Sequence, residues 1–414
     1  MKLGKYSLGI GDRFAHQATA QLQALLMAKE ADVTLTPVWN KSFREHKIIG
    51  SEPGQTREQA DRAVQALQWT DAYFVDADHI NLKNVDYFLD SSDFFTIDVA
   101  DFIGKQGDRE AIDQFIQKCV SFTGSITLPI INKRLDISKS VIQSVAFKYI
   151  SAVQQAHKIY QHILIKKGNT PFIVEVSMDE TEEPQSPHEL FLILFALSHY
   201  KIPLQTIAPK FSGRFNKGID YIGNLDRFSK EFEQDCSVVN LAVSEFGLPR
   251  GLKLSVHSGS DKFSLYPVIR EVIKRYNAGL HVKTAGTTWL EELAGLAESG
   301  GSGLALAKKI YRESLTRFDE LCAPYASVID IDKEQLPSAE EVESWEGAAY
   351  TGALRHDQAN PAYNKHFRQL LHVGYKIAAG MGNVYLDALT ENETIIAKNV
   401  TGNIFDRHIK PLFL

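Results

Sequence analysis

The sequence predicts an α/β fold, a (β/α)8 barrel of the TIM type, from two observations. Short runs rich in β-branched and aromatic residues alternate with helical stretches, a pattern typical of parallel βαβ units. Eight such runs are present, and eight parallel strands can close into a barrel. The predicted strands are residues 6–11, 33–38, 72–77, 94–99, 171–177, 203–208, 251–257 and 279–284. An open doubly wound sheet is the alternative.

Two segments of the 414-residue chain exceed a minimal barrel. A long segment with a helical stretch at residues 141–166 separates the fourth and fifth predicted strands. We therefore predict a barrel domain at residues 1–330 with an insertion around 105–168. Residues 331–414 are predicted to form a helical extension packed on the barrel. Ser186, Pro187 and Glu189 predict a capped helix start just after the fifth strand.

Composition excludes several classes of partner. Hydrophobic residues make up 44% and charged residues 23% of the chain, an ordinary balance for a globular protein. The net charge is −6 without any run of Lys or Arg, so no nucleic-acid partner is expected. No apolar run approaches the roughly 18 residues of a membrane span, so we expect a cytoplasmic protein without a membrane partner. Three scattered cysteines, Cys119, Cys236 and Cys322, are predicted to be buried thiols. The oligomeric state stays open, a homo-oligomer included.

Ionisable side chains collect toward the carboxyl ends of three predicted strands. Because side chains alternate between the faces of a strand, each of these strands carries its ionisable residues on one face. They are Glu175 and Asp179, Lys253 and His257, and His281 and Lys283. Structural barrel interiors favour apolar residues, and inward charges cost desolvation unless they are paired or metal-bound. We therefore expect the active site at these strand ends.

Three histidines at or just beyond strand ends are predicted to hold a divalent metal: His79, His257 and His281. Imidazole and carboxylate donors without cysteine suit Zn, Mn, Co, Ni or Fe. Spacing gives no local signature such as H-E-x-x-H, and a single histidine is more often structural. The metal hypothesis therefore depends on three histidines meeting at the mouth of one barrel.

Carboxylates nearby are candidate acids and bases. Moving a proton beside a ketone and returning it to the opposite face needs two groups, and a metal would stabilise the enediolate between the steps. Asp78 and Glu180 are the first pair, with Asp179 and Glu175 as substitutes. In the alternative interpretation these carboxylates only hold Lys283 and Arg13 in ion pairs.

A small anionic sugar is the expected substrate, because cationic donors near the strand ends match carboxylate oxygens. The candidate substrate-binding residues are Arg13, Glu175, Lys210, Arg214, Lys253, Ser258 and Lys283. A Schiff-base lysine is the rival interpretation for Lys253 or Lys283.

Six segments around the predicted strand ends share a further pattern: residues 76–79, 98–104, 176–182, 208–211, 254–262 and 281–288. In these segments the sequence resembles the tagaturonate epimerase family, and residues 281–288 are the most specific of them. The resemblance implies metal-dependent conversion of D-tagaturonate to D-fructuronate in hexuronate catabolism. It implies Asp78 as proton carrier and His79, His257 and His281 as metal ligands, and we expect proton transfer beside the ketone. The alternatives are a metal-dependent sugar-acid isomerase or retro-aldol lyase, and a non-catalytic barrel that binds sugar acids.

Overall fold

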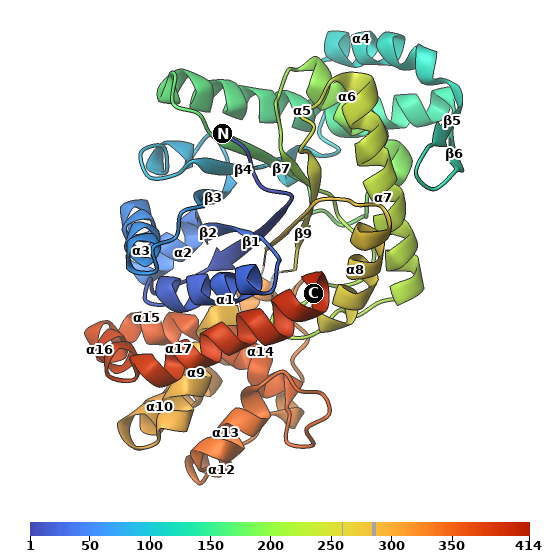
Figure 1. Cartoon of the computed structure of the whole chain (residues 1–414). Coiled ribbons are helices and arrows are strands. Elements are labelled where there is room, and N and C mark those ends of the chain that lie inside the picture. Colours follow the sequence, from blue (N-terminus) through green and yellow to red (C-terminus); the bar gives the residue numbers. More distant parts are fainter. Residues whose placement is uncertain (259, 284–286) are drawn as a thin grey trace.

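A closed barrel of eight parallel strands forms the centre of the molecule (Figure 1), as predicted. The computed structural model describes residues 1–258, 260–283 and 287–414. Around the barrel the strands follow the order β1-β10-β9-β8-β7-β4-β3-β2. Their bounds are β1 (Tyr6–Gly11), β2 (Thr36–Ser42), β3 (Phe74–Ile80), β4 (Phe94–Asp98), β7 (Ile173–Ser177), β8 (Thr206–Ala208), β9 (Lys253–His257) and β10 (Leu280–Lys283). Thr284, the predicted last residue of the eighth strand, lies outside the described residues.

The second and third strands run further than predicted. β2 ends at Ser42 where residue 38 was expected, and β3 ends at Ile80 where residue 77 was expected. The extra residues include Asn40, Lys41 and Asp78. These polar side chains interrupt the apolar pattern from which strands are predicted, although their backbones still pair with the neighbouring strands.

Helices cover the outside of the barrel between successive strands (Figure 1). They are α1 (Ala18–Glu30), α2 (Phe43–Ile49), α3 (Pro53–Ala66), α6 (Pro187–His199), α7 (Leu225–Phe246) and α8 (Tyr266–Arg275), and α9 (Thr287–Ser299) follows the last barrel strand. Short 3-10 turns add η1 (Val85–Tyr87), η2 (Ala100–Phe102) and η4 (Phe263–Leu265). The predicted helix start after the fifth strand is confirmed, because the Ser186 hydroxyl and Glu189 form a capping box at α6.

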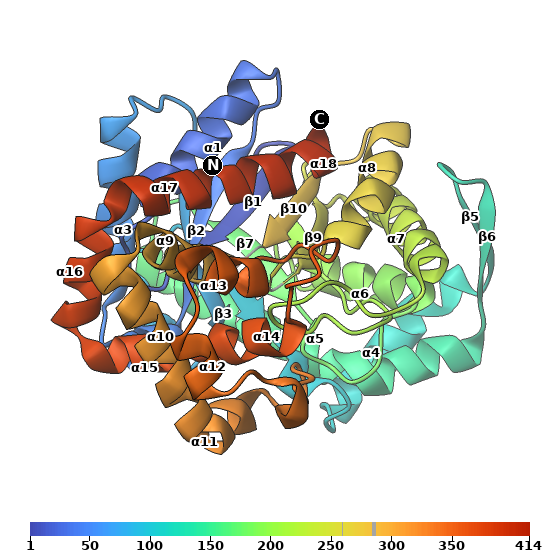
Figure 2. The same cartoon turned by 90° about the horizontal axis from the view of Figure 1, so that it is seen from below.

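The insertion between β4 and β7 is only partly helical. It contains α4 (Arg109–Cys119), η3 (Val120–Phe122), β5 (Gly124–Leu128), β6 (Lys133–Ile137) and α5 (Lys139–Lys167). α5 matches the predicted helix at 141–166 to within two residues at its start and one at its end. The antiparallel pair β5–β6 was not predicted; it projects from the body of the protein (Figure 2), and most of its residues are exposed.

The predicted C-terminal helical extension is confirmed, and Figure 2 shows its α13 and α14 in front of the barrel. Within residues 331–414 it comprises η6 (Lys333–Gln335), α12 (Ala339–Glu343), α13 (Gly347–Leu354), α14 (Lys365–Val373), α15 (Tyr375–Met381), α16 (Asn383–Glu391), α17 (Glu393–Gly402), the π-helix η7 (Asn403–Ile409) and α18 (Lys410–Phe413). Three further helical elements, α10 (Gly301–Thr316), α11 (Phe318–Cys322) and η5 (Ala323–Tyr325), precede residue 331 and follow the last barrel strand. The domain boundary at residue 330 stays a prediction. No helix in the described part of the chain is long and apolar enough to cross a membrane.

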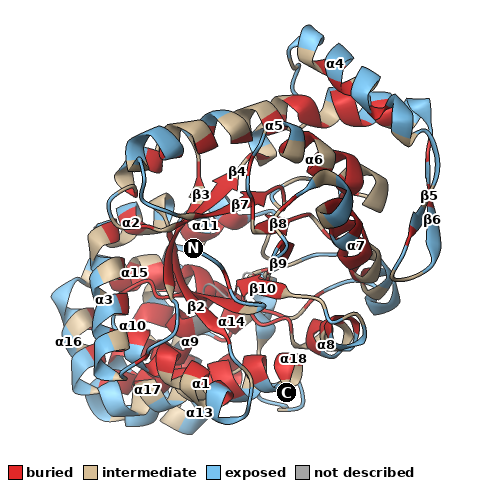
Figure 3. Ribbon diagram, turned by 45° about the horizontal axis from the view of Figure 1, so that its top comes forward, coloured by how far each residue is buried: buried red, intermediate tan, exposed pale blue. Residues whose placement is uncertain are grey.

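The barrel interior changes character along its axis. At the amino-terminal end of the strands, Val38, Phe74, Phe94 and Ile173 form a small apolar cluster with Leu3. Toward the carboxyl ends the buried inward side chains become polar and charged. Figure 3 shows the barrel strands as buried, whereas the outer faces of helices such as α3 and α4 are exposed. All three cysteines are buried, as predicted. The apolar layer therefore supports a polar site at the mouth of the barrel.

Candidate active site

Lys283 of β10 is the centre of a buried charge cluster. Its Nζ lies 2.8 Å from Asp76 Oδ2, 2.8 Å from Asp78 Oδ1 and 3.0 Å from Glu175 Oε1. It also donates a hydrogen bond of 2.6 Å to Thr96 Oγ1. Three carboxylates thus surround one ammonium group, and burial makes each uncompensated charge costly.

The carboxylates around Lys283 divide into two kinds. Burial and the charges of Asp78 and Glu175 outweigh the attraction of Lys283 and raise the pKa of Asp76 to about 7. Burial also raises the pKa of Asp78, but the charges of Lys283 and His79 outweigh it and lower that pKa to about 2. Asp78 is therefore ionised at neutral pH, whereas a pKa of about 7 leaves Asp76 partly protonated there.

A break in the regular geometry of β3 brings Asp78 and His79 to the same site. Consecutive strand residues normally point to opposite faces. His79 has φ 51°, in the left-handed region, and the pairing of β3 with β4 shifts register between Ala77 and Ile80. His79 Nδ1 lies 3.1 Å from Asp98 Oδ2, and its Nε2 lies 3.9 Å from Asp78 Oδ1.

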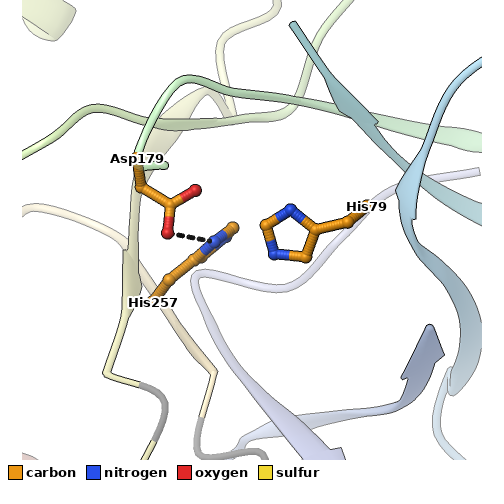
Figure 4. A group of neighbouring side chains, drawn as sticks. All are labelled: His79, Asp179 and His257. Atoms are coloured by element: carbon orange, nitrogen blue, oxygen red, sulfur yellow. Dashed lines mark ion pairs between the residues drawn. The ribbon is translucent and has the colours of Figure 1, made fainter. Parts of the chain in front are cut away.

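His257, the last residue of β9, faces His79 across the mouth of the barrel (Figure 4). The two rings are 5.3 Å apart between centroids, with 80° between their planes. His257 Nε2 lies 2.8 Å from Glu175 Oε1, and Nδ1 lies 3.2 Å from Asp179 Oδ2. One potential ligand atom from each of His79, Asp179 and His257 falls within 4.8 Å of the other two. His79 forms a second such group with Asp98 and Glu180.

The donor set of His79, Asp179 and His257 fits a divalent cation. Each histidine has one ring nitrogen beside a carboxylate, Asp98 or Glu175, which is how metal-ligating imidazoles are commonly oriented. Burial lowers the pKa of His257, but Asp179 and Glu175 outweigh it and raise that pKa to about 9. The carboxylates thus create a field that favours positive charge, and imidazole with carboxylate suits the metals expected from the sequence.

His281, the third predicted ligand, does not reach this group. Its Nδ1 lies 2.8 Å from Ser7 Oγ, and its ring packs 5.5 Å from that of Phe94 in the apolar layer. Burial lowers the pKa of His281 to about 3, so the ring is neutral. His281 precedes Lys283 by two residues on the same face, about 6.6 Å deeper in the barrel. The predicted meeting of three imidazoles is therefore wrong for His281.

Two predicted substrate-binding cations also lie elsewhere. Lys253, at the start of β9, donates to the backbone oxygen of Gly4 at the amino-terminal end of the barrel. Arg214 is exposed and pairs with Asp330 at 3.2 Å. Alternation along the strand correctly predicted that Lys253 faces inward, but it could not predict at which end of the barrel the side chain lies.

The remaining predicted residues lie at or near the mouth. Glu175 and Lys283 are in the charge cluster, and the Ser258 hydroxyl donates to the Lys283 backbone oxygen at 2.6 Å. Lys210 is half-buried in the loop after β8, where its backbone NH donates to Gln185 Oε1 at 2.6 Å. Arg13 follows β1 and is buried.

Three residues of the cluster were given no role from the sequence: Asp76, Thr96 and Asp98. Asp76 precedes Asp78 by two residues and Asp98 ends its strand, so strand alternation could have included both. Thr96 has no charge to draw attention to it. Its hydroxyl donates to Asp76 at 2.9 Å, which makes it a link between Lys283 and that carboxylate.

A (β/α)8 barrel with histidines and carboxylates at the carboxyl ends of its strands defines a barrel enzyme. Residues 1–410 match the sequence model of tagaturonate epimerase, UxaE, and the chain belongs to this family. A tagaturonate/fructuronate epimerase of Thermotoga maritima is 28% identical, with 97% of this chain and 80% of that protein covered. Native fructuronate-tagaturonate epimerase of Cohnella laeviribosi has the same fold, with TM-score 0.78 and 24% identity over 98% of this chain and 81% of that one. The structure of the same Cohnella laeviribosi enzyme with two glycerols has TM-score 0.80 and 24% identity, with 100% of this chain and 83% of that chain covered.

Proposed function

We propose that this epimerase interconverts D-tagaturonate and D-fructuronate with a divalent metal held by His79, Asp179 and His257. The observation that carries the proposal is the convergence of these three side chains, with ligand atoms within 4.8 Å, at the catalytic end of the barrel. Family membership and the name of the Thermotoga maritima relative support the pair of sugars.

The chemistry of this pair requires a revision of the expected mechanism. D-tagaturonate and D-fructuronate are 2-ketoses that differ in configuration at C4. The ketone at C2 acidifies the hydrogen on C3, not the one on C4, so proton transfer beside the ketone cannot invert C4. Cleavage and re-formation of the C3–C4 bond can invert it, which is the retro-aldol chemistry considered above as an alternative.

Asp78 is suited to start this cleavage, because its carboxylate is ionised and reaches the mouth of the barrel. It accepts the proton of the C4 hydroxyl, C4 becomes an aldehyde, and the electron pair of the C3–C4 bond moves toward the C2 ketone. The aldehyde rotates, the bond re-forms on its other face, and Asp78 returns the proton. The cation, when bound, would polarise the C2 ketone as a Lewis acid. Lys283 holds Asp78 in place through their 2.8 Å contact.

Isotopic labelling tests this mechanism. Purified protein with added metal is incubated with D-tagaturonate carrying deuterium at C4, and the product is followed by NMR. We expect D-fructuronate that keeps the deuterium, because the C4–H bond never breaks. Loss of the label to water contradicts bond cleavage, and uptake of ¹⁸O from water at C4 indicates elimination and rehydration. Accumulating fragments indicate a lyase, and binding without turnover a non-catalytic barrel.

Metal analysis tests the ligand set separately. Purified wild-type protein should contain a divalent metal, and the same measurement tells which of Zn, Mn, Co, Ni or Fe it is. His79→Ala and His257→Ala should lose it while remaining folded. His281→Phe is the matched control, since His281 lies below the site beside Phe94. Full occupancy in His79→Ala or His257→Ala would remove that residue from the ligand set.

A further inference from the structure

Arg13 is a buried cation with donor groups that the fold leaves unused. Its side chain is 9% exposed, and its guanidinium stacks 4.4 Å from the centre of the Tyr375 ring. Nε lies 3.2 Å from Glu45 Oε1 without hydrogen-bond geometry, and Nη1 has no hydrogen-bond partner among the described residues. A buried guanidinium usually satisfies its donors, so those of Arg13 are available to a ligand.

His372 of α14 presents a second unused group in the same region. It is 1% exposed, and within the described parts of the chain neither ring nitrogen has a hydrogen-bond partner. Burial lowers the pKa of His372 well below its usual value, and the charges of Arg13 and Lys217 lower it further. Its ring is therefore neutral and offers one N–H donor amid positive charge.

Hydrogen bonds hold the backbone of Lys217 in place on both sides of the residue. Its backbone NH donates to Val328 O at 2.8 Å, and its backbone oxygen accepts from Gln369 Nε2 at 2.9 Å. The next residue, Gly218, is also held, because its oxygen accepts from Arg368 Nε at 2.6 Å. Ordering the backbone at both polar groups costs chain entropy, and it fixes the position of the Lys217 Cα, from which the side chain extends.

Positive charge dominates this region. Arg44, Lys217 and Lys376 lie 5.3, 5.8 and 5.4 Å from the centre of the Tyr325 ring. The Tyr325 hydroxyl in turn lies 3.0 Å from that of Tyr375, on which Arg13 stacks. Two acids, Glu45 and Glu180, and two cations, Arg13 and Arg44, act on Lys217. The charges that act most strongly on His372 are all cationic; they come from Arg13, Lys217, Arg368 and Lys262. An anion would relieve this imbalance and match the unused donors.

Lys217 connects this cationic region to the candidate metal site. Glu180, whose charge acts on Lys217, also belongs to the group of His79 and Asp98 at the barrel mouth. We infer that Arg13, Lys217 and His372 bind the carboxylate of a hexuronate, so that its ketone end lies toward His79 and His257. The choice of a hexuronate rests on the proposed function.

Binding of a non-reacting sugar acid tests the inference without turnover. D-Galacturonate carries the carboxylate but no ketone, and D-galactose is its neutral counterpart. Calorimetry should show wild-type protein binding galacturonate more tightly than galactose. Arg13→Gln and, as a second variant with an independently anchored backbone, Lys217→Met should each weaken galacturonate binding by about 10- to 100-fold, the range of charge-assisted hydrogen bonds. Galactose binding should change little.

Arg312→Gln is the matched control, because Arg312 lies on α10, half exposed, and pairs with Glu343 at 3.6 Å. It should bind both sugars as the wild type does. Equal affinity of the wild type for the two sugars, or unchanged galacturonate binding in folded Arg13→Gln and Lys217→Met, would overturn the inference. Uronate binding that depends on Arg13 in a protein inactive on tagaturonate would reject the epimerase reaction but retain the carboxylate site.

Discussion

The Lys283 ammonium and the Asp78 carboxylate lie 2.8 Å apart across the barrel, on β10 and β3. This ion pair fixes the proposed base, yet Lys283 is shared with Asp76 and Glu175. The ammonium therefore has two separable effects. It stabilises the fold by offsetting buried negative charge, and it keeps Asp78 ionised and aimed at the substrate.

Lys283→Met should destabilise the protein strongly, because it leaves buried carboxylates without their cation. Breaking a buried pair in this way costs about 3–5 kcal/mol, measurable by urea unfolding. The double variant Lys283→Met/Glu175→Gln should recover part of the loss, since Glu175 is an ionised carboxylate 3.0 Å from Lys283 and its replacement removes one of the facing charges. A loss below about 1 kcal/mol for the single variant would mean that water compensates the cluster.

Gly9→Ala should disturb Lys283 from the neighbouring strand. A Cβ at Gly9 would lie 2.7 Å from Lys283 Cγ and 3.2 Å from its Cα, closer than carbon atoms normally approach. Three carboxylates hold the end of the side chain, so it cannot swing away. We expect a stability loss of about 1–3 kcal/mol, typical of overpacking, together with reduced turnover. Gly54→Ala on α3, where an added Cβ meets nothing within 4 Å, is the control. Equal behaviour of the two variants would contradict this role for Gly9.

Local pattern predicted the barrel and the face on which most site residues lie, because period-two alternation is a property of the strand itself. The local pattern could not predict how far along the barrel axis each side chain lies. His281 and Lys283 share a face, yet the first lies beside Phe94 below the site and the second reaches Asp78. Lys253 is buried still nearer the amino-terminal end of the barrel.

The bulge in β3 is a second feature beyond local pattern. Alternation would send Asp78 and His79 to opposite faces, and only the left-handed backbone of His79 brings both to the mouth. The cationic region was equally hidden, because Arg13, Lys217 and His372 are far apart in sequence. Their meeting depends on how α14 and α15 pack over the barrel, and of the three only Arg13 was predicted from the sequence to bind substrate.

Asp98→Ala should weaken metal binding without removing a ligand. Asp98 Oδ2 lies 3.1 Å from His79 Nδ1 and orients the ring, and loss of such a partner typically costs about 10- to 100-fold in metal affinity. Competition with a chelator measures the effect. Asp86→Ala is the matched control, because Asp86 forms a similar pair with His162 at 2.6 Å on the surface. Unchanged metal affinity in Asp98→Ala would mean that contacts other than Asp98 orient His79.

His46→Phe should remove part of the acid sensitivity of the fold. His46 is 1% exposed, and its ring packs 5.9 and 5.7 Å from those of Tyr87 and Phe88, so phenylalanine keeps the packing but loses the 2.9 Å hydrogen bond between Nδ1 and the Ser51 hydroxyl. Burial and the charge of Lys41 lower the pKa of His46 from 6.5 to about 3. Below pH 6.5 the unfolded chain therefore binds a proton on His46 that the folded protein does not bind. The free energy of unfolding falls as the pH drops.

The size of this effect follows from the two pKa values of His46. Between pH 7 and pH 5 the wild type should lose about 2 kcal/mol more than His46→Phe, since each pH unit below the unfolded pKa costs about 1.4 kcal/mol. Urea unfolding at both pH values measures the difference. The contributions of the other buried histidines to the pH dependence cancel, because both proteins contain them. Parallel losses in the two proteins would mean that His46 becomes charged in the fold without cost.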